Sequence, residues 1–271
     1  MTVLLMTANY LLPLLYLALL IDYGAAFFLR TKSHGRNFAL AAVLALHIVY
    51  LHLLGYQAGR LPLSSYEILS VLAAANAAVY CVVEYAVKER RTGSFVLLAV
   101  FLLQYSASVL MPRGLFLPSQ AVMQSPWQKV HLLPAILAYT AFTISAIYGM
   151  LHLLAVRDLK QRRFGMLFDR LPPLDLLGTM NWHAMLSGFV FVSLAIITGA
   201  IMYLRSRSIG DMEARTFIRI IAGVMAWLIY AGAVSGKLLG RWPALRVAKV
   251  SVAGFVVVMI MLIAGMFLSQ W

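Results

Sequence analysis

The sequence predicts an all-α protein that crosses a membrane about eight times. Of its 271 residues, 63% are hydrophobic and only 11% are charged, whereas an ordinary soluble domain is about half apolar and about a quarter charged. The apolar residues gather in eight long runs, and a helix needs about 20 such residues to cross the hydrocarbon core. Helices are expected because each backbone N–H in hydrocarbon must find its partner within its own segment. We therefore expect one transmembrane domain over residues 1–271, multi-pass in the cytoplasmic (inner) membrane.

Each apolar run is long enough to cross the membrane once. The first run follows no basic segment and is long for a signal peptide, so we expect it to remain as a helix. Two connections are long, residues 111–126 and 157–182, and Pro172 with Pro173 is expected to stop any helix within the second. The eight runs cover residues 7–29, 37–56, 64–87, 93–111, 127–156, 183–204, 217–238 and 248–269.

Lysine and arginine predict the orientation of the runs. Fifteen of these 22 residues lie after the first, third, fifth and seventh runs, and seven lie on the other side. Cytoplasmic loops carry the excess of basic residues, so both termini are expected outside. The net charge of +13 therefore reflects topology, and no nucleic acid is expected as a partner, because the basic residues form short clusters between apolar runs.

Four of the six histidines lie where an ionisable group would mark a functional site, since such groups are costly inside a membrane. His47 is about 15 Å into the second run by the helical rise, and His52 follows on a different face near the outer surface. His131 lies one turn into the fifth run after Trp127, and His183 begins the sixth. Neutral imidazole is a common axial ligand of haem iron. We predict that all four bind haem, with His47, His131 and His183 as iron ligands and His52 as a stand-in for His131.

The alternative role of each histidine is a hydrogen bond between helices. The remaining two suggest no site, because His34 lies in a basic loop and His152 at the inner end of the fifth run. No segment resembles a Walker loop, a nucleophile elbow or HExxH. The single cysteine, Cys81, excludes an intrachain disulfide. An enzyme is not expected.

Several segments in a fixed order carry a family resemblance. The pattern W-x-x-x-H-x(7)-Y-x-x-F occurs at Trp127, His131, Tyr139 and Phe142. Other segments accompany it: GRLPLSSYEILSVLAA before it, and LHLLAVRDLK, RLPPLDLL, NWHAMLSGFVFVSLAIITGAIMY and WLIYAGAVSGKLLGRW after it. Together they resemble the cytochrome c assembly family, which includes CcsA, CcmC and HemX-like proteins. The likeness extends over residues 40–260, is strongest from residue 127 onward, and is closest to short members such as YpjD.

The resemblance implies an inner-membrane protein that binds or handles haem. The family pattern implies a histidine at the outer end of the fifth helix, matched by His131, one at the inner start of the next, matched by His183, and a second-helix histidine, matched by His47. His131 and His183 would lie at opposite membrane faces and should not share one iron. The family's haem-presenting segment W-G-x-x-W-x-W-D is replaced by RSRSIGDMEARTF at residues 205–217, and its later outer histidine is replaced by Ser235.

These departures keep two other functions under consideration. A non-catalytic, HemX-like regulator would bind a cytosolic tetrapyrrole-synthesis enzyme on residues 157–182, or the chain would be a structural subunit of a larger membrane complex. The expected partners are then membrane lipid and other membrane proteins of cytochrome assembly. A small-molecule transporter is less well supported, because Pro13 and Pro134 interrupt their runs at positions that are not symmetrical.

Overall fold

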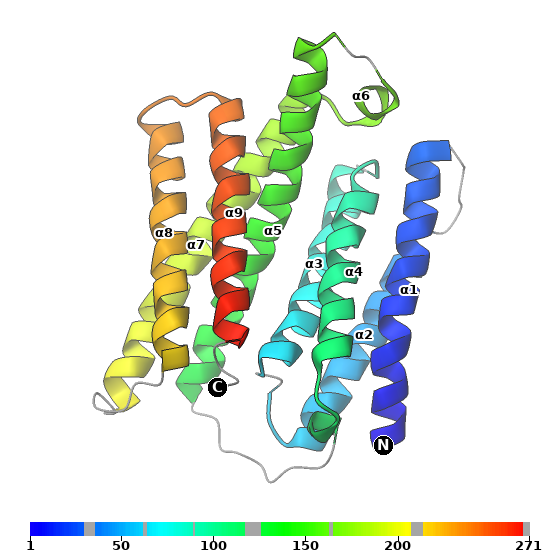
Figure 1. The fold of residues 1–271 in the computed structure, drawn as a ribbon, viewed down its shortest axis with the longest axis vertical. Helices are drawn as coiled ribbons and strands as arrows, with labels where there is room; N and C mark the ends of the chain where they lie inside the picture. Colours follow the sequence, from blue (N-terminus) through cyan, green and yellow to red (C-terminus); the bar gives the residue numbers. More distant parts are fainter. Residues whose placement is uncertain are drawn as a thin grey trace. The chain divides into compact units, whose positions relative to one another are not determined.

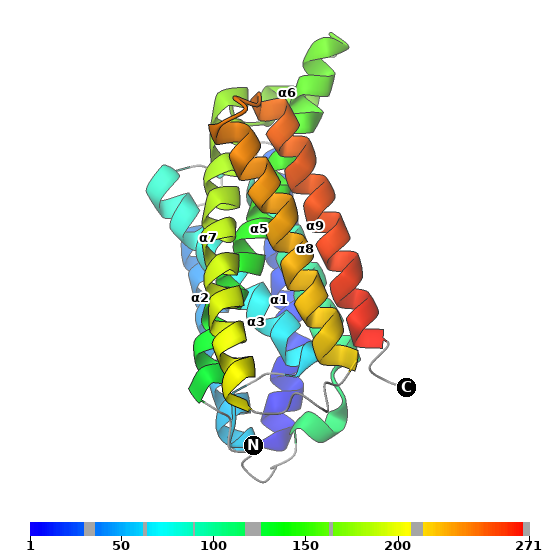
Figure 2. The same cartoon turned by 90° about the vertical axis from the view of Figure 1, so that its left-hand side faces the viewer.

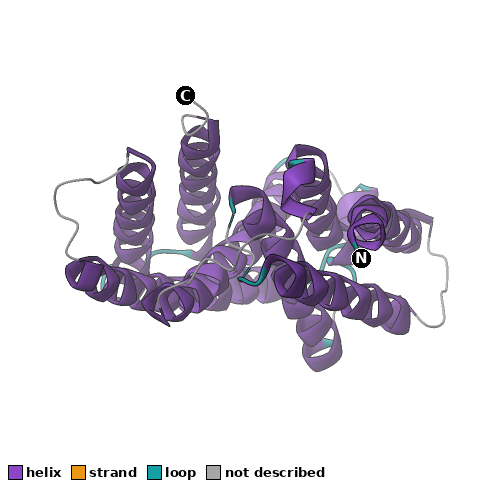
Figure 3. Cartoon of the chain, turned by 90° about the horizontal axis from the view of Figure 1, so that it is seen from below, coloured by secondary structure: helices purple, strands orange, loops and turns teal. Residues whose placement is uncertain are grey.

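The computed structural model describes residues 1–29, 36–61, 64–88, 90–116, 126–162, 165–206 and 214–267. Across these ranges the chain forms helices joined by short connections, and no strand occurs in them (Figure 3). Eight of the helices in these described ranges are long and apolar enough to cross a membrane. The predicted all-α, multi-pass architecture and its number of spans are therefore confirmed, while the placement of both termini outside stays a prediction.

The chain divides into two compact units, Met1–Gln124 and Ser125–Trp271. Each unit contains four of the long helices. We expected one transmembrane domain over residues 1–271. Whether the two units form one domain stays a prediction.

The first unit is a four-helix bundle in which consecutive helices are neighbours. Its helices are α1 (Thr2–Leu29), α2 (Arg36–Ala58), α3 (Ser65–Val87) and α4 (Gly93–Leu110), followed by the short η1 (Arg113–Phe116). Helix α1 contacts α2 and α4, and α3 also contacts α2 and α4 (Figure 1). The bundle thus has a closed interior to which all four helices contribute.

The start of α3 is fixed by a reciprocal cap. The Ser64 hydroxyl accepts a hydrogen bond from the Glu67 backbone N–H at 3.2 Å, and the Glu67 carboxylate accepts one from the Ser64 backbone N–H at 2.7 Å. The Glu67 side chain is fully buried and also pairs with Arg60 at 2.9 Å. This cap satisfies backbone donors that a helix start leaves open. It explains why α3 begins at this point in the segment GRLPLSSYEILSVLAA.

The second unit is also built from four long helices. They are α5 (Pro126–Lys160), α7 (Leu174–Ser206), α8 (Ala214–Leu238) and α9 (Ala244–Phe267), with the short α6 (Met166–Arg170) between α5 and α7. Helix α5 packs against α7 and α9, and α8 packs against the same two helices. Helices α8 and α9 run side by side from their connecting turn (Figure 2).

Helix α7 begins nine residues earlier than the predicted start at residue 183. It starts at Leu174, directly after Pro172 and Pro173, because proline is tolerated at a helix start, where no intrahelical partner for its missing N–H is needed. Asp175 in the first turn is favourable beside the positive end of the helix dipole. Helix α6 ends at Arg170 and α7 begins after the two prolines, so no helix continues through them, as expected. His183 consequently lies inside α7 and not at its start.

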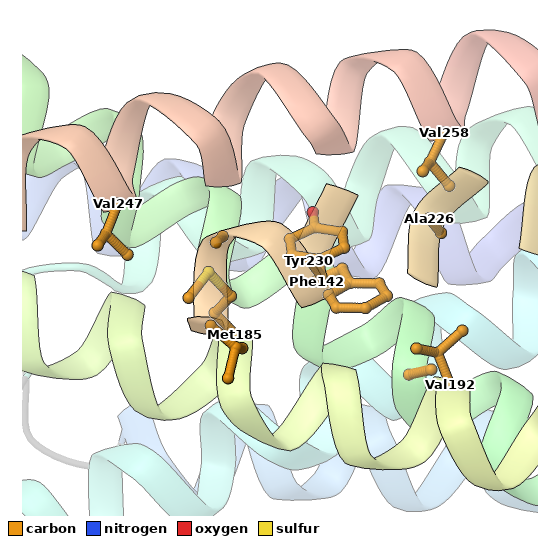
Figure 4. Close-up of a cluster of buried hydrophobic side chains, with 10 residues drawn as sticks. Phe142, Met185, Val192, Ala226, Tyr230, Val247 and Val258 are labelled. Carbon is orange, nitrogen blue, oxygen red and sulfur yellow. The ribbon is translucent and has the colours of Figure 1, made fainter. Parts of the chain in front are cut away.

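The core of the second unit is centred on two stacked rings. Phe142 of α5 and Tyr230 of α8 lie flat against each other, with ring centroids 3.7 Å apart and planes 5° apart (Figure 4). A Cβ at Gly188 of α7 would come within 2.5 Å of the Phe142 ring. Because no residue larger than glycine fits there, α7 approaches α5 closely at this level.

Candidate functional site

His47 lies at the centre of a polar network in the first unit. Its ring is fully buried, with Nδ1 3.0 Å from the Tyr16 hydroxyl and Nε2 2.9 Å from the Ser70 hydroxyl. The Ser70 hydroxyl in turn contacts Gln104 at 2.8 Å. The network therefore begins on α1 and passes through α2 and α3 to α4.

The direction of each hydrogen bond fixes the form of the His47 ring. The Gln104 amide donates to the Ser108 hydroxyl, so its oxygen is free to accept the Ser70 proton. With that proton committed, Ser70 accepts from His47, and His47 carries its proton on Nε2. Nδ1 then accepts the Tyr16 hydroxyl proton. Both ring nitrogens are used in hydrogen bonds between helices, so an iron would have to displace one of them.

A second branch returns the network to α1. The Ser108 hydroxyl donates to the Asn9 carbonyl at 2.7 Å, and the Asn9 amide donates to the Ser108 carbonyl at 3.1 Å. Tyr50 donates to the Asn9 side-chain oxygen at 3.1 Å. Each polar group has a partner on another helix, which is how buried polar groups are tolerated in an apolar interior. The network holds the four helices of this unit in register.

His131 presents a different arrangement, at the start of α5 in the second unit. Its Nδ1 lies 2.9 Å from the backbone carbonyl of Ala195 on α7. A carbonyl can only accept, so Nδ1 carries the proton and the neutral ring has its lone pair on Nε2. Among the described residues, Nε2 has no hydrogen-bond partner. An imidazole held through one nitrogen with the other free is the usual arrangement of a metal-binding histidine.

The His131 ring rests against a glycine. A Cβ added to Gly199 would come within 3.2 Å of two ring atoms of His131. The hydroxyl of Thr198 lies 3.5 Å from Nδ1 and itself donates to backbone carbonyls of α7. The ring is therefore placed by the backbone and by small side chains of α7, and not by a bulky neighbour.

An aromatic ring and a cation lie one helical turn before His131, toward the start of α5. Trp127 precedes it by four residues, about 6 Å along the axis, and the Arg205 guanidinium lies 4.5 Å from the centroid of the Trp127 ring. Arg205 comes from the last turn of α7. An imidazole nitrogen with a lone pair, a flat apolar ring and a cation at one end of α5 and α7 suit a flat, apolar, anionic ligand that carries a metal ion.

The other two predicted histidines have no such setting. His52 on α2 and His183 on α7 are exposed, and neither has a hydrogen-bond partner among the described residues. His183 is twelve residues from Ala195 along α7, so about 18 Å separates it from the level of the His131 contact. This spacing agrees with the expectation that His131 and His183 do not share one iron. The roles of His47, His52, His131 and His183 as ligands stay predictions, and His34 lies outside the described residues.

Sequence reasoning gave too little weight to His152. It is buried, and its Nδ1 lies 3.2 Å from the Leu174 carbonyl at the first turn of α7. By the same argument, the proton is on Nδ1 and Nε2 holds the lone pair. His152 and His131 are 21 residues apart, about six turns of α5, and both rings contact α7. The 21-residue interval could have indicated that both rings lie near the same side of the helix.

A polar cluster joins the helices of the second unit between these two histidines. The Asn181 amide donates to the Ser145 carbonyl at 2.7 Å and to the Ser251 hydroxyl at 3.0 Å. The Tyr230 hydroxyl donates to the Ser251 carbonyl. The described part of the chain holds no group of three or more His, Cys, Asp or Glu side chains suited to a metal ion. A metal centre with three or more such side chains is thus not formed by the described residues.

The comparisons with known proteins agree with the family resemblance. A family model described as cytochrome C assembly protein matches residues 62–271. The cytochrome c biogenesis protein CcsA of Heterosigma akashiwo is 23% identical over 256 residues, which cover 82% of this chain and 78% of that protein. Protein HemX of Brevibacillus brevis is 29% identical over 140 residues, 48% of this chain and 52% of that protein.

The chain thus spans about half the length of the HemX relative and more than three quarters of the CcsA relative. No solved structure matches. Since the family model covers most of the chain, including α3 to α9, the expectation that arose from the segment order is confirmed. The chain belongs to the cytochrome c assembly protein family.

Proposed function

We propose that this protein binds haem as cargo for cytochrome c assembly, at the His131 end of α5 and α7, and that it does so in the inner membrane without being an enzyme. The observation that carries the proposal is the hydrogen bond from His131 Nδ1 to the Ala195 carbonyl. It leaves Nε2 unprotonated and unpaired among the described residues, as an axial iron ligand requires.

The surroundings of His131 suit the rest of a haem. The porphyrin is flat and apolar and could lie along the outer turn of α5, where Trp127 is half-buried. Its propionates need a cation, and Arg205 is held over Trp127 at 4.5 Å. A guanidinium that already stacks on an aromatic ring is well oriented for a carboxylate. The CcsA relative supports the assignment to cytochrome c biogenesis.

The test is an absorption spectrum and an iron assay of the full chain, purified in detergent from haem-replete cells. Wild-type protein should contain iron and show a Soret band. His131→Ala should lose most of both, and free imidazole added during purification should restore the band, because it fills the space of the missing ligand. Leu133→Ala, an exposed apolar position two residues along α5, is the matched control and should behave as wild type. Wild-type protein with neither iron nor a Soret band would rule the proposal out.

A second function is supported by the match to Protein HemX and by the absence of tryptophan from residues 205–217. In this proposal the chain is a non-catalytic membrane regulator or a subunit of a larger complex. A protein partner would then co-purify in a fixed ratio, and His131→Ala would leave its binding unchanged. A partner that is lost together with the Soret band in His131→Ala would instead favour haem handling.

A further inference from the structure

The turn between α8 and α9 carries a cluster of basic residues around one tryptophan. Lys237 lies in the last turn of α8, Trp242 lies in the turn, and Arg246 lies in the first turn of α9. Arg241, between them, is exposed and has a positive φ of 49°. This end of the second unit contains one of the basic loops that the charge distribution places at the cytoplasmic face.

The Trp242 ring is seated on the backbone of α8. A Cβ added to Gly236 would lie 2.5 to 2.7 Å from three atoms at the fused edge of the indole. The Trp242 backbone N–H also donates to the Gly236 carbonyl at 3.0 Å. Because the ring fits only over a glycine, its position is determined by the fold and not by chance contact at the surface.

Two cations lie close to Trp242, one at its backbone carbonyl and one over its ring. The Lys237 ammonium donates to the Trp242 backbone carbonyl at 3.4 Å, and the Arg246 guanidinium lies 5.2 Å from the centroid of the Trp242 ring. Neither cation forms an ion pair with a carboxylate in the ranges that the structure describes. The indole N–H likewise has no acceptor there. Two cations and one neutral N–H donor are thus gathered at one place, with no anion among the described residues there.

We propose that this cluster, Lys237, Trp242 and Arg246, binds the phosphate of an anionic phospholipid. A phosphate accepts hydrogen bonds from ammonium, guanidinium and indole N–H groups together and removes the repulsion between the cations. Tryptophan is typical of the headgroup level of a membrane.

Two neighbouring residues favour a lipid over a soluble anion. Leu238 and Leu239, directly after Lys237, are 63% and 85% exposed. Exposed apolar side chains beside a phosphate site suit acyl chains, and a free phosphate or an acidic protein segment would gain nothing from them. Basic pockets between membrane helices on the cytoplasmic side are known to hold anionic headgroups, so the source of the phosphate is taken to be the surrounding bilayer.

The test is native mass spectrometry of the full chain in detergent, titrated with phosphatidylglycerol or with phosphatidylcholine of the same acyl chains. Wild-type protein should retain phosphatidylglycerol at least about tenfold more tightly than phosphatidylcholine, since each cation near an anionic membrane surface adds to the binding free energy. Lys237→Gln with Arg246→Gln should remove that preference. The matched control is Arg157→Gln with Lys160→Gln, which removes the same charge from two exposed cations at the end of α5.

An equal loss of the phosphatidylglycerol preference in the control pair would overturn the proposal, because the preference would then come from diffuse surface charge and not from this cluster. Displacement of phosphatidylglycerol by millimolar inorganic phosphate would also overturn it, in favour of a soluble-anion site. The melting temperature of each variant checks folding. If the double variant does not fold, each single substitution should still weaken phosphatidylglycerol retention about threefold relative to phosphatidylcholine, and unchanged retention in both singles would count against the site.

Discussion

The Nδ1 of His131 donates a hydrogen bond to the backbone carbonyl of Ala195, 2.9 Å away. A main-chain carbonyl on α7 thus sets the tautomer of an imidazole on α5. The position of the free Nε2 then depends on how closely these two helices approach, and that approach is set by small residues of α7. Changes in α7 should therefore affect a ligand bound by His131, even where they do not touch it.

Gly199→Val is expected to displace the His131 ring. Even a Cβ at Gly199 would lie 3.2 Å from ring atoms Cε1 and Nδ1, and valine adds two methyl groups to it. The Soret absorbance per protein should fall at least about fivefold, while the melting temperature changes little because the site is at a helix end. Gly223→Val is the control, since nothing lies within 4 Å of a Cβ there. Full haem content in Gly199→Val would show that haem binding does not depend on the position of the His131 ring against Gly199.

Arg205→Gln is expected to weaken haem binding without changing the iron ligand. The guanidinium over Trp127 supplies the charge for a propionate, and a charge-assisted hydrogen bond contributes about 1.5–3 kcal/mol. Haem affinity measured by titration should fall about tenfold or more, with the position of the Soret band unchanged. Arg205→Lys should recover part of the affinity. A shifted band in Arg205→Gln would mean that the coordination itself depends on Arg205.

The number of membrane-spanning helices in the described residues was predictable from the sequence, because each span must satisfy its own backbone and therefore appears as one apolar run. The sequence also indicates His131 as a candidate site residue, from its place one turn after Trp127, and its role as a ligand stays a prediction. Its tautomer was not predictable, because the bonding carbonyl of Ala195 is 64 residues away. The hydrogen-bond network of His47 was not predictable either, because its partners Tyr16 and Ser70 are 31 and 23 residues away in sequence.

His47→Ala is expected to destabilise the first unit and to leave the Soret band unchanged. The substitution removes two hydrogen bonds and leaves the Tyr16 hydroxyl without its partner, while the Ser70 hydroxyl keeps its bond to Gln104. A buried polar group without a partner costs about 1–3 kcal/mol, and somewhat less between membrane helices. Thermal unfolding in detergent should show this loss of stability as a lower melting temperature. His52→Ala, at an exposed position on the same helix, should show none. A lost Soret band with unchanged melting would instead make His47 an iron ligand.

The stacked pair Phe142 and Tyr230 is expected to dominate the stability of the second unit. Phe142→Ala removes the ring that lies between the Tyr230 ring and Gly188. A buried Phe→Ala change in a soluble core costs about 3–5 kcal/mol. We expect about 2 kcal/mol here, because lipid is as apolar as the core and the packing contacts are the main loss. Tyr230→Phe retains the stacked ring and loses only the hydrogen bond to Ser251, so its melting temperature should fall much less. If both variants melt alike, the hydrogen bond from Tyr230 to Ser251 of α9, and not the stacking on Phe142 of α5, is the main stabilising contact of Tyr230.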